Sequence, residues 1–157
     1  MPAEKSTDWA AMVKKWLMDE QIFKVKLPNN ENVAWAFEGS YPFMHPQPTS
    51  IVVLNPKGKD FIVIQIAIKM SPQHEEAFIR KDPDVLNMFY ERFKVMLLEK
   101  DISYNIDQQA NQWILTEQIY YEGLTKDHFF KDVRRVYNSS VLGNLMIEQI
   151  LNSPASI

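Results

Sequence analysis

The segment from Asp60 to Met70, Asp-Phe-Ile-Val-Ile-Gln-Ile-Ala-Ile-Lys-Met, constrains the fold more than any other part of the chain. Successive side chains of a strand point to opposite faces, so even-numbered residues share one face and odd-numbered residues the other. The even face is wholly apolar. The odd face is apolar for about half its length and consists of Phe61, Val63, Gln65, Ala67 and Lys69. Such a strand is typical of the middle of a sheet, with helices on one face and a partial cover on the other.

The composition bounds the kind of protein. The chain has 157 residues, which predicts one domain spanning residues 1–157 with a core of its own. It has no cysteine, which excludes a disulfide scaffold, a thiolate metal site and a cysteine nucleophile. The net charge of −3 argues against a generic nucleic-acid-binding protein, whose affinity depends on a basic surface. The polar N-terminus and the absence of a run of ~18 apolar residues predict a cytoplasmic protein that does not enter a membrane.

The first third of the chain predicts a helix followed by a hairpin. Ser6 or Thr7 is expected to cap a helix that ends near Glu20. Its apolar residues recur at helical spacing and form one stripe: Trp9, Met12, Val13, Trp16 and Leu17. Residues 22–27 and 33–37 alternate as two half-buried strands, and Gly39 is expected to end the second.

The segment 41–48, Tyr-Pro-Phe-Met-His-Pro-Gln-Pro, contains three prolines and is predicted to leave the sheet as a stiff, extended loop. We expect it either to cover one edge of the sheet or to contact a partner through Tyr41, Phe43 and Met44, because rigid aromatic residues and Met suit protein recognition.

The rest of the chain adds strands and helices in a definite order. Residues 51–54 form a strand that a type I turn at 55–58 joins, antiparallel, to the strand at 61–70. Ser71 and Asp82, each followed by Pro, are expected to cap a short helix and a longer one that ends near Lys100. The buried stripe of the longer helix is Val85, Leu86, Phe89, Phe93, Met96 and Leu97.

The C-terminal third predicts a second strand pair and a closing helix. Strands at 102–106 and 113–121 flank a polar turn at 107–111, and Thr125 caps the last helix. The small residues Ser139, Ser140 and Gly143 would let that helix approach a neighbour closely. The expected apolar positions of the helix are Phe129, Phe130, Val133, Val136, Tyr137, Val141, Leu145, Ile147 and Ile150.

The predicted fold is therefore α+β: an antiparallel sheet of about five to six strands with helices mainly on one face, in the order α-ββββ-αα-ββ-α. A doubly wound parallel sheet is disfavoured, because single helices do not alternate with strands.

Catalytic and cofactor motifs give no positive signal. His74-Glu75-Glu76 resembles the start of a zinc helix, but position 78 is Phe where a second His is needed. The four glycines are too far apart for a phosphate loop or a dinucleotide fingerprint, and no Gly-x-Ser-x-Gly elbow is present. We expect no catalytic residue, no metal and no cofactor, although a site assembled from distant carboxylates stays open.

The start of the last helix is locally basic. Lys131, Arg134 and Arg135 follow Lys126, with Asp127 and Asp132 among them. This segment is either a solvated helix face or a docking patch for an acidic segment or a phosphate.

The element order resembles that of type III secretion chaperones: a helix, a group of strands, a helical middle, a two-strand hairpin and a closing helix. The resemblance covers nearly the whole chain. It implies a small, acidic, cytoplasmic, usually dimeric protein that binds extended segments of client proteins. The topology is also similar to that of small uncharacterised prokaryotic or archaeal domain families of unknown function. The chain differs in one extra strand, at 22–27 or its partner, and one extra short helix at 71–81.

The leading hypothesis is a non-enzymatic, chaperone-like homodimer that binds a protein or peptide, with no nucleic acid or membrane partner. Its partner-binding residues would include Phe61, Val63 and Gln65, the residues of the odd face that lack an obvious cover. The alternatives are an enzyme or small-ligand protein with a pocket beside residues 41–48, where His45 would meet a buried carboxylate, and a structural subunit of a larger complex.

Overall fold

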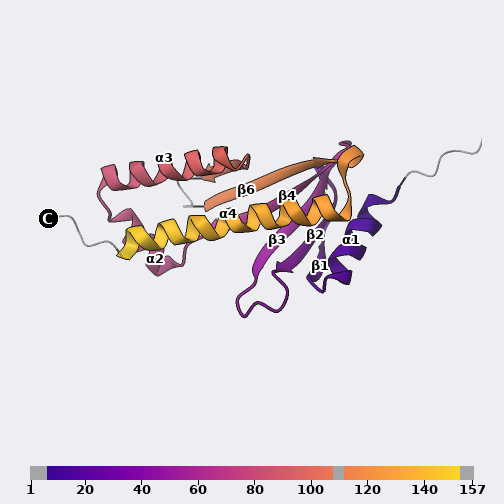
Figure 1. Ribbon diagram of the computed structural model, residues 1–157, viewed down its shortest axis with the longest axis horizontal. Helices are drawn as coiled ribbons and strands as arrows, with labels where there is room; N and C mark the ends of the chain where they lie inside the picture. The colour runs from indigo at the N-terminus through magenta and orange to yellow at the C-terminus, as the bar shows by residue number, and fades with distance from the viewer. Residues whose placement is uncertain (1–6, 108–111, 153–157) are drawn as a thin grey trace, which may run out of the picture. The chain divides into compact units, whose positions relative to one another are not determined.

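The computed structural model describes residues 7–107 and 112–152. Their element order is the predicted one: α1 (Trp9–Asp19), β1 (Phe23–Leu27), β2 (Val33–Tyr41), β3 (Thr49–Pro56), β4 (Phe61–Lys69), α2 (Pro72–Ile79), α3 (Pro83–Glu99), β5 (Ser103–Asp107), β6 (Gln112–Tyr120), a 3-10 turn η1 (Tyr121–Gly123) and α4 (Lys126–Asn152) (Figure 1). The turn predicted at 107–111 lies, apart from Asp107, outside the described residues.

The strands form one six-stranded antiparallel sheet in the order β1-β2-β3-β4-β6-β5, which confirms the predicted fold class. β4 lies inside this sheet, as its two-sided apolar pattern predicts. Its even face is fully buried: Ile62, Ile64, Ile66 and Ile68 expose 3% or less of their surface. On its odd face Phe61, Val63 and Gln65 are half-buried, and Ala67 and Lys69 are exposed.

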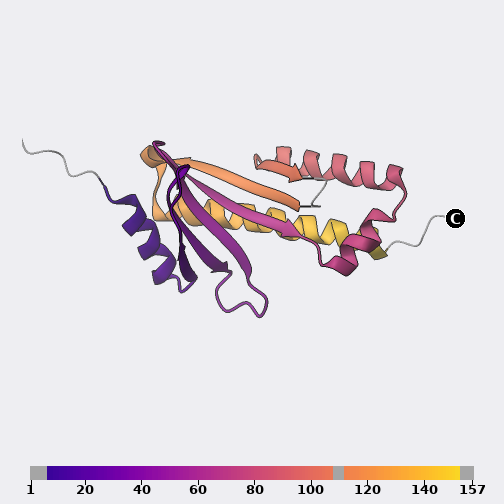
Figure 2. The ribbon, with the colours of Figure 1, turned by 180° about the vertical axis from the view of Figure 1, so that it is seen from behind.

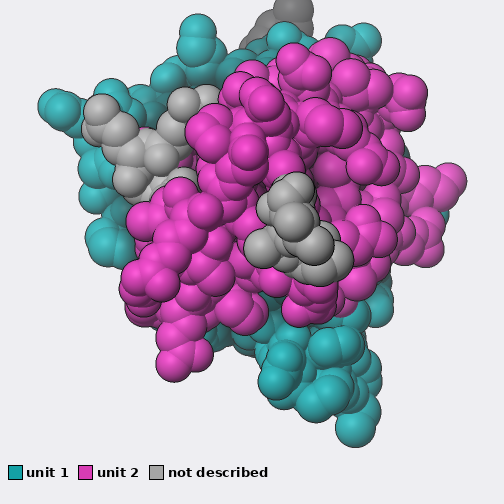
Figure 3. Space-filling view, turned by 90° about the vertical axis from the view of Figure 1, so that its left-hand side faces the viewer, with its two compact units in different colours: residues 1–64, 118–130 teal, residues 65–117, 131–157 magenta. Residues whose placement is uncertain are grey.

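The described chain divides into two compact units (Figure 3). Unit 1 consists of residues 1–64 and 118–130, and unit 2 of residues 65–117 and 131–157. The division falls within β4, β6 and α4, so each of these elements contributes residues to both units.

In unit 1, α1 packs through Val13 and Leu17, which are fully buried, and through Trp16, whose ring contacts Phe129 at 5.7 Å. Asp8, rather than Ser6 or Thr7, caps this helix: its carboxylate accepts a hydrogen bond from Ala11 N at 3.0 Å. Asp is as good an N-cap as Ser and better than Thr, so a capping residue directly before Trp9 decides the start.

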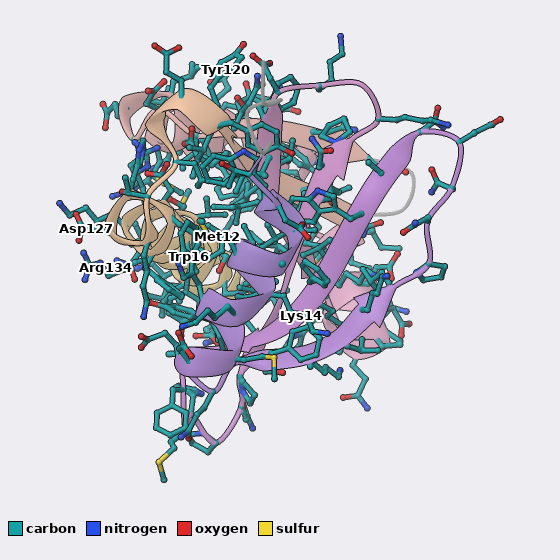
Figure 4. All side chains as sticks on the ribbon, turned by 90° about the vertical axis from the view of Figure 1, so that its right-hand side faces the viewer. Met12, Lys14, Trp16, Tyr120, Asp127 and Arg134 are labelled. Atoms are coloured by element: carbon teal, nitrogen blue, oxygen red, sulfur yellow. The ribbon has the colours of Figure 1, made fainter. Side chains whose placement is uncertain are left out.

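The side of α1 that carries Met12 is more exposed to solvent than the sequence predicted. Met12 was expected in the buried stripe but is 36% exposed. Figure 4 shows Lys14 and Trp16 on different sides of this helix. The Lys14 ammonium lies 5.5 Å from the centre of the Phe23 ring, a cation–π contact that covers part of the first strand.

The prediction that Gly39 ends the second strand is wrong. β2 continues to Tyr41, and Gly39 pairs with Ile51 of β3. A Cβ at this position would lie 2.9 Å from the carbonyl oxygen of Ile22. Glycine therefore permits a close approach of two backbones inside the sheet rather than a break.

The turn between β3 and β4 lies one residue later than predicted. The amide of Lys59 donates to the carbonyl of Pro56 at 3.1 Å, so Lys57 and Gly58 are the central residues. Gly58 has a φ of 76°, which glycine adopts without strain. The cause is Asn55, which stays in the strand and donates to the carbonyls of Lys59 and Phe61 at 2.9 and 2.8 Å.

In unit 2, both predicted helix caps are confirmed. Ser71 accepts from His74 N at 3.2 Å, and Asp82 accepts from Asp84 N at 2.8 Å. The core of this unit is an aromatic cluster in which Phe78 meets the rings of Phe89 and Trp113 edge to face, at 5.4 and 6.0 Å. The cluster consists of Phe78, Phe89, Tyr90, Phe93 and Trp113.

Thr125 caps α4 as predicted, accepting from His128 N at 3.1 Å. The expected close approach is also confirmed: a Cβ at Gly143 would lie 2.7 Å from the Phe93 ring and 2.9 Å from Ile68. Two positions expected to be apolar and inward, Val141 and Leu145, are instead 36% and 49% exposed. They lie on a side of α4 that the described part of unit 2 leaves open.

Candidate protein-binding surfaces

The segment 42–48 leaves the sheet and projects past the ends of β2 and β3 (Figures 1 and 2). Tyr41 was predicted to belong to this loop, and that prediction is wrong. It is the last residue of β2 and pairs with Thr49 of β3. Phe43 and Met44 are 51% and 83% exposed, so their side chains are available to a partner.

His45 offers no support for a catalytic pocket beside this loop. Its Nδ1 accepts a hydrogen bond from the backbone amide of Gln47 at 3.0 Å. This hydrogen bond stabilises the local turn. The enzyme hypothesis required a hydrogen bond between His45 and a buried carboxylate.

The odd face of β4 continues onto the end of β6 in unit 1. The ring of Phe61 meets that of Tyr120 edge to face at 5.5 Å, and Tyr120 is 54% exposed at the surface (Figure 4). Val63, two residues along the same face, is half-buried. Gln65 is half-buried as well. Tyr120 was not among the predicted partner-binding residues, because the pairing of β4 with β6 is set by tertiary structure.

The basic segment of α4 is partly used inside the molecule. Arg135 is half-buried and pairs with Glu117 and with Asp132, the latter at 3.3 Å. Lys131 and Arg134 are exposed, and Figure 4 shows Arg134 at the surface. Of the three predicted basic residues, Arg135 has the most evident structural role, because two carboxylates neutralise it.

A groove lies between α3 and the C-terminal part of α4 in unit 2, and it was not predicted from the sequence. It encloses about 290 Å³. Phe89, buried in the aromatic cluster, contributes to its lining. The complete lining of this α3/α4 groove is Val85, Met88, Phe89, Arg92, Met146, Gln149 and Ile150.

Exposed apolar side chains occur on both helices that line the α3/α4 groove. On α3, Met88 and Val95 are 60% and 53% exposed. Leu98, which is 67% exposed, lines a different depression together with Ile102 and Tyr104. On α4, Leu142 and Leu145 are 37% and 49% exposed. Large apolar side chains that gather at the surface of a soluble protein mark interaction sites, and Met88 is an exposed side chain of this kind in the lining of the groove.

Arg92 is the charged residue in the lining of this groove. Its guanidinium has no ion-pair partner among residues 7–107 and 112–152. Arg92 also lines a second, shallower depression further along α3, together with Glu91, Val95, Met96 and Glu99. An unpaired cation on an apolar wall is a specificity element for an anionic group.

Ionisable groups near these surfaces show modest effects. Burial in the aromatic cluster raises the pKa of the Tyr90 hydroxyl. Burial also raises the pKa of Tyr121, an effect to which Asp60 adds and which a hydrogen bond from Trp35 opposes. Within the described ranges, no group of three or more His, Asp or Glu side chains is arranged to hold a metal ion. In the same ranges, no helix is long and apolar enough to span a bilayer.

The fold and the surfaces together define the class of protein. It is an α+β protein with a six-stranded antiparallel sheet, and two of its helices leave an apolar groove open. The chain belongs to the family described as an uncharacterized conserved protein, DUF2299, whose model matches residues 10–147. No curated protein matches the sequence significantly.

Two solved structures share the fold. An uncharacterized protein from Methanothermobacter thermautotrophicus aligns with a TM-score of 0.79 and 24% identity, covering 88% of this chain and 96% of that one. A chain of the ExsC-ExsE complex aligns with a TM-score of 0.55 and 12% identity, covering 85% of this chain and 92% of that one. These matches confirm the resemblance to the type III secretion chaperone-like fold and to an uncharacterised family.

Proposed function

We propose that this protein is a non-enzymatic, cytoplasmic, chaperone-like module that binds a segment of another protein in the α3/α4 groove. The observation that supports the proposal most strongly is the groove itself, with an apolar lining and Met88 60% exposed at its rim. The similarity of the fold to a chain of the ExsC-ExsE complex, a protein–protein complex, adds support of a general kind.

The energetics favour occupation of the groove by a partner. Fully burying a side chain such as Met or Leu stabilises by roughly 1.5–3 kcal/mol, so covering the lining residues Met88, Met146 and Ile150 more completely would supply several kcal/mol before the cost of association. Met side chains adapt to partners of different shape, and both Met88 and Met146 line the groove. A module that accepts protein segments would use such residues.

We further propose that two copies associate through the odd face of β4. Phe61 and Val63 are half-buried and Tyr120 is exposed beside Phe61, so a second copy would complete their burial. Sedimentation velocity tests this directly. The wild type is expected to sediment as a dimer at micromolar concentration and Tyr120→Lys as a monomer; a monomeric wild type would refute self-association.

Peptide binding tests the main proposal. A library of immobilised peptides is probed with the purified wild type and with two matched variants, Met88→Glu in the groove and Met44→Glu in the 42–48 loop. Both methionines are exposed, at 60% and 83%, so neither change should disturb folding. The proposal predicts peptides that bind the wild type and Met44→Glu equally and Met88→Glu at least about tenfold more weakly.

Two outcomes would contradict it. If the wild type retains no peptide above background, the function is wrong. If Met44→Glu abolishes binding while Met88→Glu does not, the 42–48 loop is the contact surface and the groove is not.

A further inference from the structure

We infer that the occupant of the α3/α4 groove is an amphipathic α-helix of a partner protein that presents a carboxylate to Arg92. This inference rests on the proposed function and names the chemistry of the partner. It follows from the shape of the groove, the spacing of the apolar residues along it and the charge of its wall.

The walls of the groove are two helices of unit 2. Its lining residues come from the first half of α3 and from the last part of α4, which run alongside each other in Figures 1 and 2. A third helix lying between two others buries its apolar stripe against both, as in helix-in-groove recognition. An extended strand would leave its backbone donors unpaired here, because no sheet edge lines the groove.

Residues on one side of α3 have the spacing that a helical partner requires. Met88, Arg92 and Val95 recur at steps of four and three, so they lie on one side of α3. From Val85 to Glu99, the groove and the second depression follow α3 for fourteen residue steps of about 1.5 Å, roughly 21 Å. A partner helix of about four turns would cover this length.

The charge of the groove selects an acidic partner. Arg92 is the charged residue of the lining and is unpaired among the described residues, so its guanidinium can take a carboxylate in a bidentate pair. Glu91 and Glu99 line the second depression and not the groove, whereas Arg92 lines both, so the carboxylate of the partner belongs over the groove and not over the second depression. A basic partner would place like charges together over Arg92, which is unfavourable.

The edges of the sheet are weaker candidates for a partner segment. β1, at one edge, carries Lys24 and Lys26 and has an irregular register between Phe23 and Val25. Charged residues and bulges of this kind protect an edge from pairing with another chain. β5, at the other edge, is a five-residue strand in which Ser103, Asn105 and Asp107 are exposed.

A charge-swap experiment tests the inference. Three fluorescent peptides of about eighteen residues, or five turns, are compared by anisotropy. The first is an amphipathic helix with Glu beside its apolar stripe, the second replaces each Glu by Lys, and the third is a scramble of the first without helical periodicity. Each is titrated with the wild type, with Arg92→Glu, and with Lys57→Glu, which makes the same charge change at an exposed turn residue of unit 1.

The wild type is expected to bind the acidic helix about tenfold more tightly than either other peptide. Arg92→Glu should reverse the order of the acidic and basic helices, while Lys57→Glu should leave it unchanged. Circular dichroism should show the acidic peptide gaining helix on binding. Far-ultraviolet spectra of the variants should match the wild type, since both substituted side chains are exposed.

The experiment distinguishes failure of the inference about an acidic helix from failure of the proposed function. If all three peptides bind the wild type with equal affinity, the groove binds protein segments but the inference about an acidic helix is wrong. If Arg92→Glu leaves the preference for the acidic helix intact, Arg92 does not select the partner and the inference is equally wrong. If none binds, and the peptide library gives no ligand either, the proposed function fails together with the inference.

Discussion

The odd face of β4 and the α3/α4 groove are both apolar surfaces, but they arise in different ways. The odd face is a local property of one segment, since its alternation can be read from residues 61–69 alone. It is half-covered, with Phe61 packed against Tyr120. The groove joins residues of α3 to residues of α4, and Met88 at its rim stays 60% exposed. Local periodicity therefore identifies the two faces of a single strand, whereas a surface made by two helices depends on tertiary packing.

The largest expected effect lies beneath the groove. Phe78→Ala should cost about 3–5 kcal/mol of unfolding free energy, because Phe78 is fully buried and touches Phe89, a groove-lining residue. Phe43→Ala, in the exposed 42–48 loop, should change stability by less than about 0.5 kcal/mol. Urea unfolding of the two variants measures the difference; equal losses would contradict a core centred on Phe78.

The contact that holds α4 in place has the next largest effect. Gly143→Ala should destabilise by about 1–3 kcal/mol, because the added methyl group would overlap the buried Phe93 ring and Ile68. The same change at an exposed helix position, Asn144→Ala, should be neutral or slightly stabilising. Thermal unfolding of both variants checks this. A stabilised Gly143→Ala would mean that α4 has room at this point, which would contradict the close contact with Phe93 and Ile68.

A matched pair of substitutions compares the two apolar surfaces directly. Val63→Glu should cost about 1–3 kcal/mol, because it places a carboxylate on a half-buried strand position. Met88→Glu should cost less than about 0.5 kcal/mol, since Met88 is mostly exposed. Chemical denaturation gives both values. If Met88→Glu is the more damaging, Met88 belongs to the core and is not available to a partner.

The smallest effect concerns pH. Hydrogen bonds from Lys24 and Ser50 hold the pKa of Glu38 below its ordinary value of 4.5. A lowered pKa in the folded state contributes stability above the unfolded pKa and loses it as the pH falls through the folded one. Because Glu38 is at the surface, Glu38→Gln should cost less than about 1 kcal/mol at neutral pH and nothing in acid. The unfolding free energies of the wild type and Glu38→Gln, measured about every pH unit between roughly pH 2 and pH 7, would show this loss. A difference between the two proteins that persists unchanged in acid would contradict this account.

Much of the fold could be predicted from sequence, because local signals determine it. The caps at Ser71, Asp82 and Thr125 and the alternation of β4 are short-range patterns with a direct physical cause. The errors arose where distant groups decide the outcome. Gly39 admits the carbonyl of Ile22, which is seventeen positions earlier in the chain, so a local rule misread it as a strand end.

The candidate site could be predicted only in part. Phe43 and Met44 are exposed, which fits the second of the two alternatives left open for residues 41–48, a contact surface. Arg135, however, is engaged by Glu117, a residue of β6 that sequence spacing does not bring near it. The α3/α4 groove escaped prediction because its residues share no motif. The stripe Met88, Arg92 and Val95 was visible in the sequence, and its position outside the predicted buried stripe of α3 is the signal that could have found it.

Methionine methyl resonances test the central claim most directly. The chain has eight methionines, and of those within residues 7–107 and 112–152, Met88 and Met146 line the groove. On titration of ¹³C-methyl-labelled protein with the acidic amphipathic peptide, the Met88 and Met146 signals should shift together with the same Kd, while those of Met12 and Met44 stay in place. Shifts confined to Met44, or unshifted Met88 and Met146 signals at saturating peptide, would contradict the claim that the α3/α4 groove is the binding site.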